Sequence, residues 1–197
     1  MNASVKLRRR PADTGGDWPE AVPALLRRIY RARGAASLSE ARPRLAQMLP
    51  PTLLGLDAAA RLLADAIGQD RHVLVVGDFD CDGATACTTA VRGLRMLGAR
   101  RVSHAVPNRQ VHGYGLSPTL VDELAGLEPD LLVTVDHGIA CHAGVAAARE
   151  RGWQVLVTDH HLPGEVLPTP DAIVNPNQPG CGFESKAMAG CGVMFYV

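Results

Sequence analysis

The chain has 197 residues, of which 47% are hydrophobic and 20% charged, and its formal net charge is zero. This length suits one globular domain with an extension. No apolar run approaches membrane-spanning length, and residues 1–20 show no apolar core of a secretory signal. The five cysteines are odd in number and form no C-x-x-C pair. They argue against a disulfide framework or a Cys-rich zinc site, and they favour the reducing cytoplasm.

Charge is unevenly distributed along the chain. Residues 1–50 contain ten Lys or Arg and four Asp or Glu, whereas residues 51–197 contain ten and sixteen. The net charges are therefore +6 and −6, and Pro50-Pro51 is the natural boundary. We expect a basic, partly helical N-terminal extension over residues 1–50 and the main domain over residues 51–197. A basic segment beside an acidic domain suits an anionic partner, and the alternative is a solvated surface.

The hydrophobic pattern predicts strands and helices that alternate through the main domain. Residues 1–21 are expected to pack loosely. Helices are expected over residues 24–33, 38–48 (broken at Pro43 or starting there), 56–68, 84–97, from Ser117-Pro118, over 142–151 and from Ser185 onward. Strands are expected over residues 73–76, 101–106, 131–135, 154–157 and 172–174, with a loop over 107–116. This alternation argues for an α/β fold, with a mostly parallel sheet and helices on both faces.

The most informative stretch follows the first of these strands. The apolar run over residues 73–76 leads into Asp78, Asp80 and Asp82, followed by Gly83. Three like charges this close repel each other unless a cation lies among them, because ionised carboxylates can only accept hydrogen bonds. A calcium loop of the EF-hand type would need glutamate where Thr89 stands. A solvated turn is the other alternative, but a buried strand leads straight into these residues.

Polar residues also follow the other strands. Asp136 follows the third strand, Asp159, His160 and His161 follow the fourth, and Arg109 lies in the loop after the second. Ligands of open parallel sheets bind at the carboxyl ends of the strands, so these side chains should share one crevice. Carboxylates with imidazoles favour Mn²⁺ or Mg²⁺, with Zn²⁺ or Fe²⁺ as the alternatives, and two hard cations suit hydrolysis of phosphate esters.

The side chains of this crevice are expected to have different roles, and some of them have two alternatives. Side chains that alternate along an extended segment point to opposite sides, so we expect His160 to bind metal and His161 to bind the substrate phosphate. Asp136 is expected to bind metal, although an isolated aspartate there could cap a helix. Asp159 either binds metal or orients a histidine. Arg109 is expected to bind phosphate through two hydrogen bonds, with a plain surface charge as the alternative.

Four ordered motifs together resemble the DHH phosphoesterase family, whose name-giving triplet matches residues 159–161. Within that family they look closest to the RecJ branch of single-strand-specific DNA exonucleases. The motifs are Gly77-Asp-Phe-Asp-Cys-Asp-Gly-Ala-Thr85, Pro107-Asn-Arg109 with Gly113-Tyr-Gly-Leu116, Thr134-Val-Asp-His-Gly-Ile139, and Val174-Asn-Pro-Asn-Gln-Pro179 with Ser185-Lys-Ala-Met-Ala-Gly190. Cys81 and His137 depart from the expected alanine and small polar residue, but neither is a proposed ligand.

The resemblance implies a 5′→3′ exonuclease that releases mononucleotides from single-stranded DNA, needs Mg²⁺ or Mn²⁺, and serves recombination and repair. By position it assigns metal ligation to Asp80, Asp82, Asp136 and His160, with Asp136 bridging two metals. It assigns phosphate binding to Arg109. Asp159 and His161 belong to the same triplet.

The resemblance also implies a longer protein. Another metal-binding aspartate, a second substrate-gripping domain and an OB-like domain are expected after the predicted helix in which this sequence ends. The activity of this segment alone is therefore left open. Two rivals remain, another DHH phosphoesterase (an oligoribonuclease or pyrophosphatase) and a non-catalytic module that binds metal and phosphate. The RecJ-like segment over residues 175–190 argues against the first, and the intact acids argue against the second. The few aromatic residues offer no obvious platform for DNA bases.

Overall fold

The structure is a computed structural model that describes residue 8, residues 15–42 and residues 44–197. Most of the segment expected to pack loosely, including Arg9 and Arg10, and the expected helix break at Pro43 lie outside these residues. The chain divides into two compact units, Met1–Pro50 and Pro51–Val197. Within the described ranges, no helix combines the length and the apolar character needed to cross a membrane.

The first unit contains short helices. Helix α1 (Ala24–Ala32) is confirmed, whereas the helix expected over residues 38–48 is two pieces, α2 (Leu38–Ala41) and the 3₁₀ turn η1 (Leu45–Gln47). Proline lacks the amide hydrogen that would continue a helix, which explains the interruption next to residue 43. The rings of Trp18 and Tyr30 stack 5.8 Å apart.

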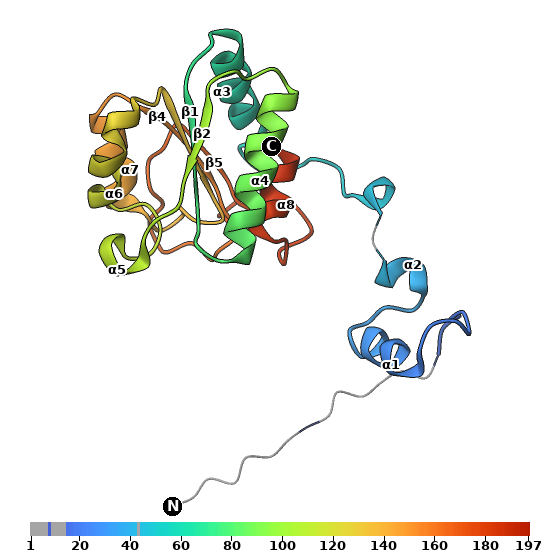
Figure 1. Cartoon of the computed structure of the whole chain (residues 1–197). Helices are drawn as coiled ribbons and strands as arrows, with labels where there is room; N and C mark the ends of the chain where they lie inside the picture. Colours follow the sequence, from blue (N-terminus) through green and yellow to red (C-terminus); the bar gives the residue numbers. More distant parts are fainter. Residues whose placement is uncertain (1–7, 9–14, 43) are drawn as a thin grey trace, which may run out of the picture. The chain divides into compact units, whose positions relative to one another are not determined.

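The second unit is an α/β domain built on one parallel sheet (Figure 1). Its strands are β1 (Val73–Gly77), β2 (Val102–Ala105), β3 (Leu131–Val135), β4 (Gln154–Thr158) and β5 (Ala172–Val174). Its helices are α3 (Leu56–Gly68), α4 (Cys81–Met96), α5 (Arg109–His112), α6 (Pro118–Leu124) with the 3₁₀ turn η2 (Ala125–Leu127), α7 (His142–Glu150) and α8 (Gly190–Tyr196). The strand order is β2-β1-β3-β4-β5, and every neighbouring pair is parallel, as predicted.

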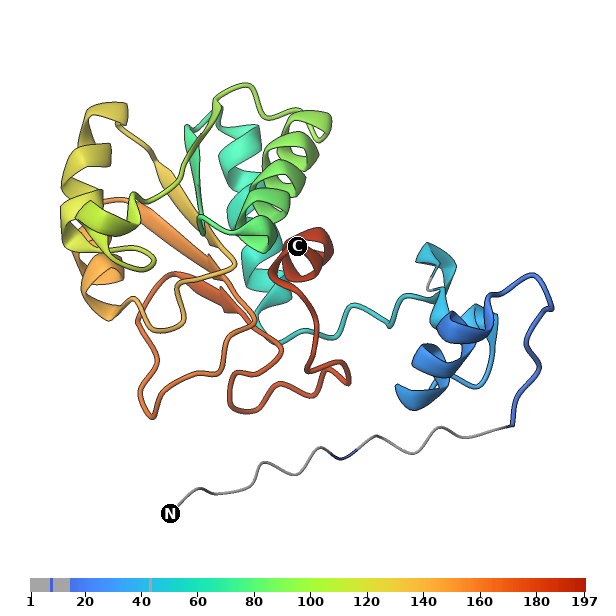
Figure 2. The same cartoon turned by 60° about the horizontal axis from the view of Figure 1, so that its bottom comes forward.

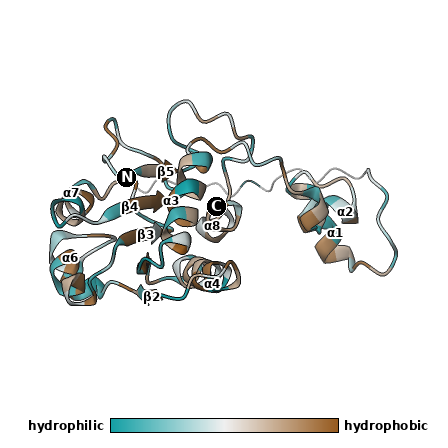
Figure 3. Ribbon diagram, turned by 90° about the horizontal axis from the view of Figure 1, so that it is seen from above, coloured by the Kyte–Doolittle hydropathy of each residue, from teal (hydrophilic) through white to brown (hydrophobic). Residues whose placement is uncertain are grey.

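Helices cover both faces of this sheet (Figure 3). Helices α6 and α7 pack on one face, where they form a buried cluster with alternate residues of β1, β3 and β4. Helices α3, α4 and α8 lie on the other face. All five residues of β1 and of β3 are buried, which explains why these strands are continuous apolar runs in the sequence. The sheet therefore provides a rigid base for the loops at its carboxyl edge.

Helix α4 begins three residues before the predicted start. Asp80 is its N-cap, and the Asp80 side chain accepts a hydrogen bond from the Gly83 amide. The capping bond satisfies one of the amides that a helix start leaves unpaired. Asp82 therefore lies in the first helical turn rather than on an extended segment.

Helix α8 begins at Gly190, so the prediction that a helix starts at Ser185 is wrong. The preceding segment is held in an irregular conformation, since the Lys186 ammonium donates to the carbonyls of Pro176 and Cys181. The Asp82 carboxylate accepts hydrogen bonds from the amides of Gly190 and Cys191, at 2.7 and 2.9 Å. A side chain from α4 thus caps α8, which no local pattern in the sequence could indicate.

Replacing Gly83 with alanine is expected to destabilise the protein by about 1–3 kcal/mol. A Cβ atom at Gly83 would lie 2.3–2.6 Å from backbone atoms of Asp78, which cannot move aside without disturbing the strand end. Gly93, on the same helix, has open space around it, so Gly93→Ala should stabilise by about 0.5–1 kcal/mol. Urea denaturation of both variants measures the difference. Equal effects at the two positions would contradict this packing.

Candidate metal centre

The carboxyl ends of β1, β3 and β4 meet at one edge of the sheet. Asp78, Asp136 and Asp159 each directly follow one of these strands. Figure 2 turns this end of the domain forward and shows the loops that follow β4 and β5 around it. The predicted convergence of sequence-distant acids and histidines at this edge agrees with this placement.

Two overlapping groups of side chains have ligand atoms close enough to share a cation. One group is Asp78, Asp80 and Asp136, and the other is Asp136, His160 and His161. Within each group the ligand atoms all lie within 4.8 Å of one another. Asp136 is the residue common to both groups.

Asp136 is held in a demanding environment. It is 1% exposed and has a φ of 66°, in the left-handed region that non-glycine residues seldom adopt. Its Oδ1 atom accepts no hydrogen bond from any described residue, although His160 Nε2 lies 3.0 Å away. Burial, together with the charges of Asp82 and Asp80, raises the pKa of Asp136 to about 8. A buried carboxylate with a free oxygen fits a bound cation, which would favour its ionised form.

Asp78 and Asp80 present carboxylates from the first motif. Asp78 is 4% exposed, and its Oδ1 accepts a hydrogen bond from the Phe79 amide at 2.7 Å. Asp80 Oδ1 is occupied by the Gly83 amide at 2.9 Å. Each carboxylate thereby has one oxygen fixed by the backbone, which orients the other. Oxygen ligands of this kind suit the hard ions Mn²⁺ and Mg²⁺.

Asp82 is the predicted ligand that the structure places differently. Its two oxygens accept hydrogen bonds from the amides of Cys191 and Gly190, and it belongs to neither ligand group. Burial would raise the pKa of Asp82, but these amides outweigh burial and lower it below the ordinary value of 3.8. Asp82 Oδ2 still lies 3.6 Å from His160 Nε2, so Asp82 borders the centre.

Asp159 is also outside both groups, and its contacts favour the orienting role. It is 1% exposed, and its Oδ2 accepts a hydrogen bond from the Ile139 amide. Its Oδ1 accepts from the amides of His160 and His161 and lies 2.8 Å from His161 Nδ1. Asp159 therefore fixes which nitrogen of His161 carries hydrogen and which one faces the site.

The two histidines of the triplet lie on the same side, contrary to the prediction from alternation. Their ring centroids are 4.6 Å apart, and both belong to the group around Asp136. Strand β4 ends at Thr158, and the hydrogen bonds to Asp159 curl the next residues into a turn. Burial lowers the pKa of His161, but its hydrogen bond to Asp159 and the nearby carboxylates outweigh burial and raise it.

His137 is a buried residue that the sequence left without a role. Its Nε2 donates to the Val76 carbonyl at 3.0 Å, and its Nδ1 has no hydrogen-bond partner among the described residues. Burial lowers the pKa of His137, which keeps the ring neutral beneath the acidic edge. This hydrogen bond connects the third motif to strand β1, which leads into the first motif.

Arg109 begins α5, a short helix within the segment expected to be a loop. The missed signal is Asn108, whose side chain caps the helix by accepting from the Gln110 amide. His112 closes the turn, since its Nδ1 accepts from the Asn108 amide and its Nε2 lies 2.7 Å from Glu123. The Arg109 guanidinium lies over the Phe79 ring, with 4.8 Å from Cζ to the ring centroid. Arg109 thus adjoins the first motif, and neither of the two ligand groups includes it.

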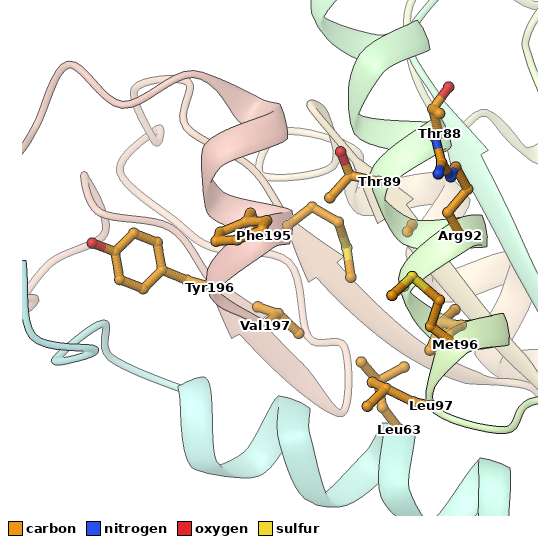
Figure 4. A pocket seen from close by; sticks show the side chains of 13 residues that line it. Leu63, Thr88, Thr89, Arg92, Met96, Leu97, Phe195, Tyr196 and Val197 are labelled. Atoms are coloured by element: carbon orange, nitrogen blue, oxygen red, sulfur yellow. The ribbon is translucent and has the colours of Figure 1, made fainter. Parts of the chain in front are cut away.

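An apolar pocket lies elsewhere on the domain. It has a volume of about 540 Å³ and is lined by residues of α4 and α8 and by Leu63 of α3. Met96, Leu97, Phe195 and Val197 line it, as Figure 4 shows. Its lining contains no carboxylate or imidazole, so it does not contribute to the metal centre.

The model of the DHH family, N-terminal domain, matches residues 72–197, which is most of the chain. The chain belongs to the DHH family. The family resemblance seen in the motifs is confirmed, and the DHH match covers all the carboxylates and histidines of the candidate centre.

RecJ proteins are prominent among the similar DHH proteins. The single-stranded-DNA-specific exonuclease RecJ of Dickeya dadantii is 49% identical over all of this chain, and that of Thermus thermophilus is 42% identical over 75% of it. The chain spans only about a third of the Dickeya protein. A crystal structure of exonuclease RecJ bound to manganese matches 75% of this chain and 37% of its own, with a TM-score of 0.66 and 42% identity.

Proposed function

We propose that this chain carries the metal centre of a RecJ-type exonuclease that hydrolyses single-stranded DNA in the 5′→3′ direction. The observation that carries the proposal is the sharing of Asp136 between two groups of cation ligands. Two cations joined by one carboxylate form the arrangement used for in-line displacement at phosphorus. The similarity to proteins named as single-stranded-DNA-specific exonucleases and to a manganese-bound RecJ supports the substrate and the metal.

The residues present fit two divalent cations, Mn²⁺ or Mg²⁺. Asp78, Asp80 and Asp136 would hold one ion, and Asp136 with His160 the other. When bound, such ions lower the pKa of water and neutralise charge on the phosphate oxygens. Asp82 keeps the start of α8 against the centre, where Gly190 approaches Asp136 so closely that a Cβ atom would overlap its carboxylate.

His161 is the phosphate-facing side chain in this proposal. Its Nδ1 is bonded to Asp159, so its Nε2 faces the site, 3.4 Å from the Tyr114 hydroxyl. Because its pKa is raised, the ring can carry a proton on both nitrogens. The protonated Nε2 would donate to a phosphate oxygen of the substrate. His161 thus lies close enough to Asp136 to belong to a ligand group. We assign it instead to donating a hydrogen bond to the substrate phosphate.

Arg109→Ala is expected to weaken binding of single-stranded DNA roughly tenfold, as the loss of a hydrogen-bonded charge implies, with a smaller effect on kcat. Arg109→Lys should recover only part of the loss, because lysine keeps the charge but not the paired donors. Steady-state kinetics at several salt concentrations measures KM and kcat separately. An Arg109→Ala variant with an unchanged KM would exclude Arg109 from phosphate binding.

A substrate panel tests the proposed function against its rivals. Single-stranded DNA, duplex DNA, short oligoribonucleotides and pyrophosphate are each incubated with the protein and Mn²⁺, Mg²⁺ or chelator. The proposal predicts metal-dependent release of mononucleotides from 5′ ends of single-stranded DNA, seen with 5′- and 3′-labelled strands. Preferred cleavage of oligoribonucleotides or pyrophosphate would instead identify another DHH phosphoesterase. Binding of DNA without turnover at saturating Mn²⁺ would identify a non-catalytic module.

The biological setting follows from this proposal. A nuclease of this specificity would act in DNA recombination and repair, and we expect it in the cytoplasm. All five cysteines are free thiols, which suits a reducing compartment.

A further inference from the structure

Two aromatic side chains remain exposed beside the metal centre. Phe79, which directly follows Asp78, is 36% exposed, and Tyr114 is 50% exposed. Their rings meet edge to face, with centroids 6.5 Å apart and an angle of 85° between the planes. A contact that served only to bury the rings would leave much less of them accessible. The pair therefore presents an aromatic surface to solvent.

This surface is continuous with the metal centre. The Tyr114 ring lies 6.1 Å from the His161 ring at 77°, and the Tyr114 hydroxyl lies 3.4 Å from His161 Nε2. His161 in turn belongs to the ligand group around Asp136. Burial and the nearby carboxylates raise the pKa of Tyr114, so its hydroxyl stays protonated and the ring stays neutral. The aromatic pair therefore directly adjoins a member of the ligand groups.

A positive charge lies at the other end of the pair. The Arg109 guanidinium lies over Phe79, with 4.8 Å from Cζ to the ring centroid. Phosphate-binding positions therefore flank the aromatic surface on both sides, with Arg109 at one end and His161 at the other. Alternating phosphate contacts and aromatic rings are the pattern that binds single-stranded nucleic acid.

The backbone holds both rings in place. Tyr114 stands between Gly113 and Gly115, whose φ angles of 75° and 71° lie in the region that favours glycine. Gly115 packs so tightly against Cys141 that a Cβ atom would overlap its sulfur. Phe79 is fixed by the hydrogen bond from its amide to Asp78. The rings are thus presented by constrained segments rather than by free loops.

We propose that Phe79 and Tyr114 form a nucleobase-stacking subsite that holds the base of the nucleotide whose phosphate lies at the metal centre. The inference rests on the proposed function and deepens it, because it requires a substrate with a base rather than a bare phosphate ester. Stacking accepts any base, since every base offers a π-face. The subsite therefore selects nucleotides without selecting sequence.

The test compares two ligands that differ only by the base. Binding of 2′-deoxyadenosine 5′-monophosphate and of 2-deoxyribose 5-phosphate to the 197-residue chain is measured by calorimetry in the presence of Mn²⁺. The nucleotide should bind roughly 5- to 100-fold more tightly, the range that one stacked base provides. Phe79→Leu and Tyr114→Leu should each remove most of this difference. Binding of the sugar phosphate should weaken much less than binding of the nucleotide in either variant.

Two controls separate stacking from a structural effect. Phe79→Tyr restores a ring and should restore the preference for the nucleotide, whereas Phe195→Leu removes an exposed ring in α8, outside the centre, and should change nothing. Equal affinity of the parent chain for the two ligands, no binding of either ligand, or equal weakening of both by Phe79→Leu would overturn the subsite. A base preference in a chain that cleaves no DNA would support the subsite and count only against the proposed hydrolysis.

Discussion

Asp136→Asn is expected to lower Mn²⁺-dependent hydrolysis of single-stranded DNA by at least ~100-fold. Mutating a residue that only supports a metal ligand already lowers metal affinity or activity about 10- to 100-fold, and Asp136 is a proposed ligand itself. The same variant should melt no lower than the parent chain in chelator. Asparagine matches aspartate in size and tolerates the φ of 66°. It also removes a buried charge whose Oδ1 accepts no hydrogen bond from the described residues, although His160 Nε2 lies 3.0 Å from it.

The combination of lost activity and retained stability is the informative result. Activity is measured as nucleotide release and stability as the melting temperature in chelator. Asp65→Asn is the matched control, since it makes the same change at an exposed position of α3 and should alter neither quantity. A chain that loses activity only because it unfolds, or that keeps full activity, would remove Asp136 from the metal centre.

Asp82→Ala is expected to lower the free energy of unfolding by about 1.5–3 kcal/mol near neutral pH, the range for hydrogen bonds to a charged group. Both oxygens of Asp82 bind amides at the start of α8, so the substitution leaves Gly190 and Cys191 without acceptors. Hydrolysis should fall as well, because Gly190 packs against Asp136. The same Asp82→Ala chain should therefore lose both stability and turnover, whereas Asp136→Asn loses turnover alone.

The pH dependence of the Asp82 effect has a definite sign. The folded protein lowers the pKa of Asp82 below its ordinary value of 3.8. The carboxylate therefore contributes stability above that value, and this contribution is lost as the pH falls through the lower, folded-state pKa. Urea denaturation of parent and variant across the acid range should show their difference shrinking. A difference that stays constant into strong acid would contradict a stabilising carboxylate.

Much of the fold follows from local patterns. Buried apolar runs identify the strands at the centre of the sheet, and the helix expected from Ser117-Pro118 is confirmed, with the Ser117 side chain accepting from the Leu120 amide as its cap. The position of the acids at the strand ends then followed from the rule for parallel sheets. These predictions needed only periodicity and capping chemistry, which act over a few residues.

What the sequence did not indicate are contacts between distant residues. Asp82 stays a predicted ligand, but its oxygens also accept hydrogen bonds from the amides of Gly190 and Cys191, more than 100 residues away. The direction of His161 depends on a turn stabilised by Asp159, which alternation along a strand does not describe. The sequence did not indicate the aromatic surface, because the chain has few aromatic residues and Phe79 and Tyr114 are far apart in the sequence. Only the fold brings their two rings together.

A titration of the chain with Mn²⁺, followed by electron paramagnetic resonance of the free ion, tests the metal centre most directly. It needs no DNA and no turnover. We predict saturable binding of two ions per chain, lost in Asp136→Asn and retained in Asp65→Asn. A free-ion signal that the parent chain does not reduce, or identical binding by the parent and Asp136→Asn chains, would contradict a centre built around Asp136.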